Sequence, residues 1–123
     1  MIKLVYIIRR RADFTPEAFR QRWLAHGPLV REVARAIHAK RYVQSHTMDS
    51  PLNDQLAQSR GMGEAYDGIT EVWWDDMQAL LAGMGTPEGR AAQQRLLEDE
   101  REFIDFAHSF LFLTEEHVIF DLR

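Results

Sequence analysis

The stretch Ile2-Lys3-Leu4-Val5-Tyr6-Ile7-Ile8 is a nearly continuous apolar run, rich in β-branched residues and followed by a polar cluster. Its apolar groups fall on both alternating faces, which is typical of a strand covered on both sides. Shortly downstream, Thr15-Pro16-Glu17 supplies an N-cap hydroxyl, a proline at the first helical position and an acid in the first turn. The sequence therefore predicts a first strand followed by a helix.

This first helix is interrupted in the sequence by Gly27-Pro28. Apolar residues recur at helical spacing before the interruption and resume after it, at Phe19, Trp23, Leu29, Val33, Ala36 and Ile37. Proline removes a backbone donor and clashes with the preceding turn. We therefore expect one helix that is kinked or broken near His26 and ends before Lys40.

Two further strands are predicted from the next half of the chain. Residues 41–48 alternate with a period of two, and residues 68–74 form a β-branched and aromatic run. Between them, residues 50–68 are rich in Pro, Asn, Asp, Gly and Ser and lack clear periodicity. We expect a long loop here, which could serve as a lid.

The last part of the chain predicts two more helices and a final strand. Asp75 or Asp76 caps a short helix through Leu81 that Gly83 stops, by the usual cap preferences. Thr86-Pro87-Glu88 opens a helix through about residue 99, with a buried side formed by Ala92, Leu96 and Leu97. We place the final strand near residues 117–120.

The predicted order is β-α-β followed by β-α-β. This is the pattern of an α+β, ferredoxin-like split βαβ fold, in which a four-stranded antiparallel sheet carries helices on one face. A chain of 123 residues and 14.4 kDa is the usual size of one domain. We expect residues 1–123 to form a single domain.

Composition excludes several classes of function. The absence of cysteine excludes disulfides, thiolate nucleophiles and cysteine-based zinc sites. The net charge of −4 and pI near 5.7 argue against a nucleic-acid or anionic-membrane partner, and no targeting signal or membrane span is readable. We therefore expect a soluble cytoplasmic protein.

No metal or cofactor motif is readable either. The five histidines lack metal-ligand spacing. Two short segments, Gly61-Met62-Gly63 and Gly83-Met84-Gly85, lack the third glycine of a dinucleotide site. We expect no bound metal and no cofactor.

The open face of such a sheet needs a cover in this chain. The first strand is apolar on both faces, and we expect Tyr42, His46, Ile69 and Trp73 on the open side. A large exposed apolar patch is rare on a monomer. A homodimer packed sheet to sheet is the simplest cover, and a ligand site would then be a mostly apolar pocket at the sheet.

His26 is the strongest candidate catalytic residue. A histidine beside a helix break has an accessible ring and titrates near neutral pH, so it could act as general acid or base. Its ring could instead bond a carbonyl that the break leaves free. His46 is the second candidate, because Tyr42 and Gln44 share its strand face. The alternative is that this polar face of an edge strand is only exposed to solvent.

Four further residues are candidates for substrate binding. Glu71 lies mid-strand, where it could orient His46 or form an ion pair with an arginine. Trp23 and Trp73 could wall a pocket or belong to the core, and Tyr66 could close over the pocket. The charged run 98–102 is interpreted as the solvated face of a helix end.

Several of these segments together resemble the EthD-type family of dimeric α+β barrel proteins. They are Phe19-x-x-x-Trp23-x-x-His26-Gly27-Pro28-Leu29, Arg41-Tyr42-x-Gln44-x-His46 and Glu71-Val72-Trp73-Trp74-Asp75. The resemblance covers most of the chain. It implies a ferredoxin-like fold, a homodimer packed sheet to sheet, and a cofactor-free pocket for a small organic molecule. It also implies an association with ether degradation beside an oxidising system, or with cyclisation, dehydration or decarboxylation of aromatic polyketides.

Three hypotheses about function follow. The first is a cofactor-independent lyase, cyclase or isomerase acting on a small hydrophobic carbonyl or phenolic metabolite, with His26 as acid–base and Tyr42, His46 and Glu71 orienting the substrate. The second is a non-catalytic protein that binds a small ligand or assists an oxidising enzyme. The third, weaker hypothesis is a cofactor-free oxidoreductase.

Overall fold

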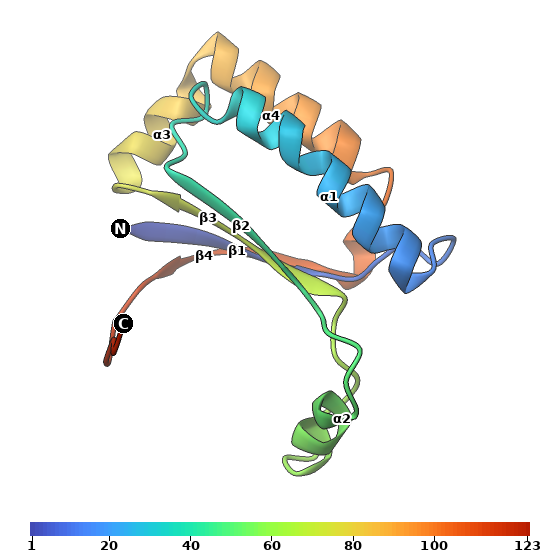
Figure 1. Cartoon of the computed structure of the whole chain (residues 1–123). Helices are drawn as coiled ribbons and strands as arrows, with labels where there is room; N and C mark the ends of the chain where they lie inside the picture. Colours follow the sequence, from blue (N-terminus) through green and yellow to red (C-terminus); the bar gives the residue numbers. More distant parts are fainter.

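The computed structural model describes residues 1–123. Its elements, in chain order, are β1 (Ile2–Ile8), α1 (Pro16–Val33), β2 (Arg41–His46), α2 (Pro51–Gln58), β3 (Gly68–Trp74), α3 (Met77–Gly85), α4 (Pro87–Glu100), a 3-10 turn (Phe106–His108) and β4 (Phe110–Glu115). The strands form one antiparallel sheet in the order β2-β3-β1-β4, and α1 and α4 cover one face (Figure 1). The predicted α+β, split βαβ arrangement is confirmed. None of the helices combines the length and the apolar character needed to cross a membrane.

Each α-helix begins at a capping side chain. Thr15, Ser50, Asp76 and Thr86 each accept a hydrogen bond from a backbone N–H in the first turn, and three of them precede a proline. The cap at Ser50 begins α2, so the prediction of a loop across residues 50–68 was wrong for residues 51–58, whereas residues 59–67 belong to no helix or strand. Helix α2 buries no residue, and its two leucines, Leu52 and Leu56, are 55% and 50% exposed.

Helix α1 continues through the Gly27-Pro28 pair, so the predicted break near His26 was wrong. A proline disfavours helical backbone at the preceding residue because its ring meets that residue's Cβ. Gly27 has no Cβ, and the helix therefore passes Pro28 without interruption. His26 lies on the buried side of this helix, where its Nδ1 atom forms a hydrogen bond with Asp99.

The final strand lies earlier than predicted. Phe110–Glu115 pair with β1, from Ile7 opposite Phe110 to Ile2 opposite Glu115. The pairing reaches Ile2, the first residue of β1, so β1 offers no further residue with which residues 117–120 could pair. The C-terminal tail (residues 116–123) is extended without a ladder partner, and Val118, Ile119, Phe120 and Leu122 are 74–90% exposed.

Two boundaries on the helix layer also differ from expectation. Helix α3 runs past Gly83, whose absent side chain lets the backbone of Ile37 approach closely. Leu97 is 38% exposed and does not belong to the buried side of α4, whereas Ala92 and Leu96 are buried as predicted. Gly83 is thus needed for packing and does not stop the helix.

The core consists of two apolar clusters between the sheet and the helices. One contains Tyr6, Ile8, Phe19, Trp23, Phe103 and Ile104. The other contains Val30, Val33, Ile37, Val72, Trp74, Leu80, Ala92 and Leu96. Helix α1 contributes to the first cluster before Pro28 and to the second cluster after it.

The strand register corrects the predicted faces of β2. Tyr42 pairs with Val72 and Gln44 with Thr70, and both of these β3 residues are buried under the helices. Residues directly opposite each other share a face, so Tyr42, Gln44 and His46 face the helices. Ile69 and Trp73 face the other side, as predicted.

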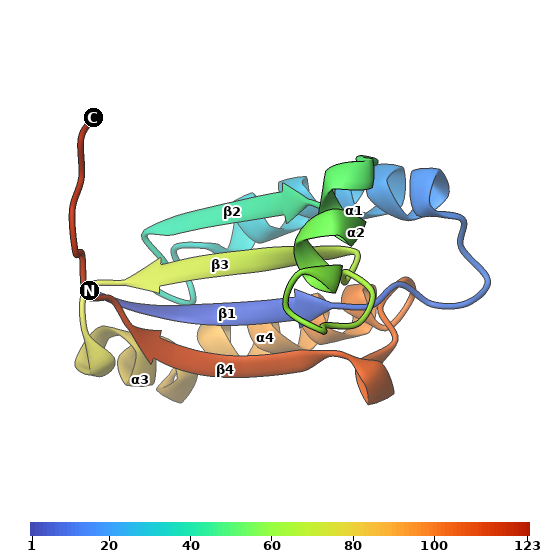
Figure 2. The same cartoon turned by 90° about the horizontal axis from the view of Figure 1, so that it is seen from below.

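The face of the sheet away from the helices, called the open face below, is the one seen in Figure 2. By strand alternation it presents Val5, Ile7, Val43, Ile69, Phe110 and Phe112, together with the Lys3–Glu71 ion pair at 2.6 Å. Helix α2 and the C-terminal tail both extend beyond this face, at opposite ends of the sheet (Figures 1 and 2).

Candidate active site

A cavity of about 100 Å³ lies between the sheet and helices α1 and α4. It occupies the boundary between the two core clusters, with Trp23 and Ile8 from one and Val30, Val72 and Leu96 from the other in its wall. Most of its lining is apolar. The few polar side chains in it are therefore the ones that could orient or react with a ligand.

Five polar side chains line the cavity besides the hydroxyl of Tyr42. They are Tyr6 on β1, His26 on α1, Thr70 on β3, and Gln93 and Glu100 on α4. The His26 ring is 3% exposed, and its Nε2 atom lies 3.7 Å from the carboxylate of Glu100. That distance is longer than a hydrogen bond, so Nε2 keeps its capacity to bond a ligand.

The other ring nitrogen of His26 is held by Asp99. The Nδ1 atom donates to the Asp99 carboxylate at 2.5 Å, and Arg22, one turn earlier on α1, donates to the same carboxylate from Nη2 at 2.5 Å and Nη1 at 3.3 Å. Because a carboxylate only accepts, the assignment of a proton to Nδ1 follows from this contact. Asp99 thus fixes the orientation of the ring.

The surroundings of His26 favour its protonated form. Burial of the ring opposes protonation, but its interactions with the nearby carboxylates of Glu100 and Asp99 outweigh burial and raise the pKa of His26 above its ordinary value. Burial of Asp99 is likewise outweighed by Arg22 and His26, which lower the pKa of Asp99. Burial, assisted by the charge of Glu100 and a hydrogen bond to it, raises the pKa of Tyr6, so its hydroxyl keeps its proton.

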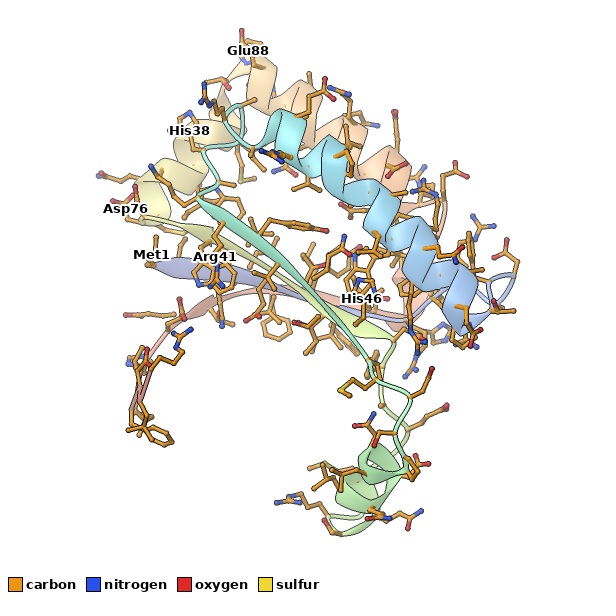
Figure 3. The ribbon with its side chains drawn as sticks, in the orientation of Figure 1. Met1, His38, Arg41, His46, Asp76 and Glu88 are labelled. Carbon is orange, nitrogen blue, oxygen red and sulfur yellow. The ribbon has the colours of Figure 1, made fainter.

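Of the residues proposed from the sequence, Trp23, His26 and Tyr42 line the cavity. Gln44 lies beside them and donates to the Tyr42 hydroxyl and to the Trp23 carbonyl, both at 2.8 Å. His46 donates from Nε2 to the Gln44 amide oxygen at 2.8 Å and stacks on the Trp23 ring at 4.2 Å between centroids. Figure 3 shows His46 between β2 and α1, and it does not line the cavity.

His46 has the character of a positioning group. Burial and the charge of Arg20 lower its pKa, which favours the neutral ring near pH 7. Its one identified hydrogen bond goes to Gln44, which in turn holds the Tyr42 hydroxyl. The face shared by Tyr42, Gln44 and His46 therefore forms a connected hydrogen-bond chain behind the cavity.

Three other proposed residues lie away from the cavity. Glu71 pairs with Lys3 on the open face, and Trp73 on the same face donates to Glu116 at 2.5 Å. Tyr66 lies before β3, with the Arg9 guanidinium 4.1 Å from its ring centroid and Phe110 at its edge. The structure does not bring these three side chains to His26.

The interpretation of residues 98–102 as a solvated face was wrong for two of them. Asp99 and Glu100 turn toward α1 and the cavity and surround His26. A signal for Glu100 does exist, since it follows the buried Ala92 and Leu96 at successive intervals of four residues. Tyr6 was hidden because it lies inside an apolar strand.

The arrangement is suited to proton transfer. A histidine with a raised pKa, a neighbouring carboxylate and a protonated phenol meet in a small apolar cavity, where polar interactions are strong. No group of three or more His, Asp or Glu side chains is placed to hold a metal ion.

Solved structures with the same fold cover nearly the whole chain. An ethyl tert-butyl ether D (EthD) family protein from Bacillus halodurans is 22% identical, with a TM-score of 0.63 over 95% of this chain and 99% of that one. A dimeric protein of ferredoxin-like fold and unknown function from Bacteroides fragilis is 14% identical, with a TM-score of 0.58 over 94% and 95%. SnoaB, a cofactor-independent oxygenase from Streptomyces nogalater, is 14% identical, with a TM-score of 0.51 over 96% and 95%.

Sequence comparison gives the family. No curated protein matches the chain significantly, but the model of the EthD domain matches residues 11–107. This range contains the Trp23 to Leu29 motif and the helices that hold His26. The predicted resemblance is confirmed, and the chain belongs to the EthD domain family.

Proposed function

We propose that the protein is a cofactor-independent acid–base enzyme that acts on a small hydrophobic carbonyl or phenolic metabolite in the cavity between α1, α4 and the sheet. The observation that carries the proposal is the position of His26 Nε2, 3.7 Å from Glu100 inside a mostly apolar cavity. Membership of the EthD family supports a role in small-molecule metabolism.

The chemistry starts from a protonated His26 and an ionised Glu100. Glu100 accepts a proton from the carbon next to the substrate carbonyl, while His26 Nε2 gives its proton to the carbonyl oxygen. The substrate C–H bond and the His26 N–H bond break, one O–H bond forms on Glu100 and one on the substrate oxygen, and the substrate becomes a neutral enol. Return of the proton to a different carbon gives an isomer, and loss of a neighbouring hydroxyl as water gives a dehydrated product.

His26 and Glu100 are neutral after the enol forms. When Glu100 gives its proton to the new carbon or to the leaving hydroxyl, the enol O–H returns its proton to His26 Nε2, and both side chains are back in their starting state. Asp99 and Arg22 keep the ring in place during the cycle. Positioned acid–base groups of this kind typically contribute about 10² to 10⁴ in rate.

Exchange of α-protons tests the proposal without knowledge of the natural substrate. Cyclopentanone is small enough for the cavity, and its α-protons are replaced by deuterium in D₂O each time an enol forms. We expect the wild-type protein to accelerate this exchange, measured by proton NMR, and His26→Gln to lose about 100-fold or more.

The matched control is His117→Gln, because His117 is exposed in the C-terminal tail. It should exchange cyclopentanone protons at the wild-type rate. Exchange no faster than in buffer, or equal rates for His26→Gln and His117→Gln, would show that His26 does not perform acid–base chemistry in this cavity.

A second candidate function is cofactor-free oxidation. The likeness in fold to SnoaB, described as a cofactor-independent oxygenase, favours it. An oxygen electrode with hydroquinone as the electron-rich phenol distinguishes it from the first: oxygen uptake above buffer supports oxidation, whereas proton exchange without uptake supports acid–base chemistry alone.

We also infer that a second copy of the chain covers the open face. Phe112, Phe110 and Ile69 are 47%, 55% and 39% exposed on that face, and the structural neighbour from Bacteroides fragilis is dimeric. Sedimentation velocity should show a dimer that Phe112→Glu dissociates. Leu24→Glu, at a 61% exposed position on the helix side, should leave it intact, and a monomeric wild-type protein would contradict the inference.

A further inference from the structure

We propose that the cavity selects a neutral, ring-sized ligand that donates a hydrogen bond to Glu100, and that it rejects carboxylates. The inference rests on the proposed function for the location of the site but concerns the chemical class of the ligand. It follows from the charges in the lining, from the free bonding capacity of Glu100 and from the size of the cavity.

Charge is distributed unevenly around the cavity. Glu100 is the only Asp, Glu, Lys or Arg side chain among the lining residues. The nearest arginine on α1, Arg22, is engaged by both of its terminal nitrogens with Asp99. A ligand carboxylate would therefore enter a low-polarity site that contains a carboxylate and no uncommitted Lys or Arg, which is unfavourable.

His26 does not supply the missing cation. Its Nδ1 atom is bound to Asp99 at 2.5 Å, and its Nε2 atom faces Glu100 at 3.7 Å. The positive charge of the ring is thus already shared between two carboxylates. A ligand anion could use it only by displacing Glu100.

The Glu100 carboxylate can accept further hydrogen bonds. An ionised carboxylate has about four lone-pair positions. Tyr6 and His26 are its polar neighbours in the cavity, and His26 Nε2, at 3.7 Å, is too far away to occupy one of these positions with a hydrogen bond. A hydroxyl or amide N–H on the ligand fits these positions and would make a charge-assisted hydrogen bond, which is stronger than a neutral one.

The size of the cavity sets the size of the ligand. An engineered protein cavity of about 150 Å³ admits benzene, so a cavity of about 100 Å³ suits a single small ring. The lining residues Trp23 and His26 on α1 are buried, whereas the lining residue Leu111 on β4 is 55% exposed. The ligand therefore enters from the side of β4 and α4 and meets Glu100 and Gln93 on that helix.

Two pairs of probes test the proposal by direct binding. Phenol and toluene have nearly the same shape, but only phenol donates a hydrogen bond. Benzamide and benzoate are also matched in shape, and they differ in charge and in the ability to donate. We expect phenol to bind about tenfold more tightly than toluene, and benzoate to bind at least about tenfold more weakly than benzamide, as measured by calorimetry or ligand-observed NMR.

The variant Glu100→Gln assigns the selectivity to one side chain. Its amide keeps an acceptor but removes the charge, so we expect benzoate to bind about tenfold more tightly than to the wild type. The matched control is Glu98→Gln, which removes the same charge two residues earlier at an exposed position of α4. It should leave all four affinities unchanged.

Several results would overturn the proposal. The wild-type protein could bind benzoate as tightly as benzamide, toluene as tightly as phenol, or none of the four probes. The substitutions Glu100→Gln and Glu98→Gln could also have equal effects on binding. If Glu100→Gln fails to fold, the wild-type comparisons still decide. If the wild-type protein shows the expected probe preferences but does not accelerate cyclopentanone exchange, the proposed reaction is rejected and the proposed ligand class stands.

Discussion

Gly68, the first residue of β3, lies directly under the ring of Trp23. A Cβ atom added at this position would meet two ring carbons of Trp23 at 2.4 and 2.6 Å and the carbonyl oxygen of Ser45 at 2.7 Å. Ordinary contacts begin near 3.4 Å. In Gly68→Ala, the indole therefore has to retreat by about 1 Å, and the backbone of β2 has to yield as well.

The expected cost follows from two opposing effects. Overpacking of a core by one methyl group typically costs about 1–3 kcal/mol, and the loss of glycine's freedom in the unfolded chain returns about 0.4–1 kcal/mol. A net loss of about 1–2 kcal/mol corresponds to a fall in melting temperature of about 4–8 °C for a chain of this length. Because Trp23 walls the cavity, phenol binding should weaken as well.

Thermal unfolding by circular dichroism and calorimetry with phenol measure both effects. The matched control is Gly85→Ala, since a Cβ on this glycine of α3 would meet nothing within 4 Å. It should leave the protein unchanged or stabilise it by up to about 1 kcal/mol. If Gly68→Ala melts at or above the wild-type temperature, the close packing of Trp23 on β3 is refuted.

Three further predictions concern pH, the core and the tail. The raised pKa of His26 means that its contribution to stability is complete below its unfolded-state pKa of about 6.5 and is lost as pH rises through the folded-state value. Urea unfolding should therefore show a larger deficit of His26→Gln against wild type at about pH 6 than at about pH 9, and an equal deficit would contradict this. Phe103→Ala, at a fully buried position, should cost about 3–5 kcal/mol in urea unfolding, whereas Phe120→Ala, at a position 76% exposed, should change stability by about 0.5 kcal/mol or less. Deletion of residues 117–123, all of which are exposed, should leave the circular dichroism spectrum intact but raise the dimer dissociation constant in sedimentation, and loss of the fold would refute this account of the tail.

The parts of the fold that were predictable are those with local signals. Thr15-Pro16 and Thr86-Pro87 marked the two long helices because cap and proline act within one turn. The same signal at Ser50-Pro51 stands in a stretch rich in Asn, Asp, Gly and Ser, whose composition favours a loop and hides the short helix α2. Residues 110–113 are apolar on both faces, so their pattern alone could not separate β4 from the tail.

The candidate site was predictable only in part, for similar reasons. His26 stood out through its motif, but its partner Glu100 lies in a charged run whose composition hides the buried stripe of α4. Tyr42, Gln44 and His46 were correctly grouped by their alternation. The side they face depends on pairing with Thr70 and Val72 on another strand, and no property of β2 itself specifies that.

The continuity of α1 through Pro28 has a consequence for how the cavity can change size. Proline has no amide hydrogen, so the carbonyl of Leu24, one turn earlier, has no helical donor. The gap falls where α1 passes from the cluster of Phe19 and Trp23 to the cluster of Val30 and Val33.

Pro28 therefore removes one of the backbone hydrogen bonds that would resist a bend at this point. The two halves of α1 can therefore tilt apart along the boundary that the cavity occupies, while each half stays packed on its own cluster. In amide hydrogen exchange, the two halves should behave as separate units of protection. The volume of about 100 Å³, which suits a single ring, is therefore maintained by the packing of the two halves and not by an unbroken series of backbone hydrogen bonds along α1.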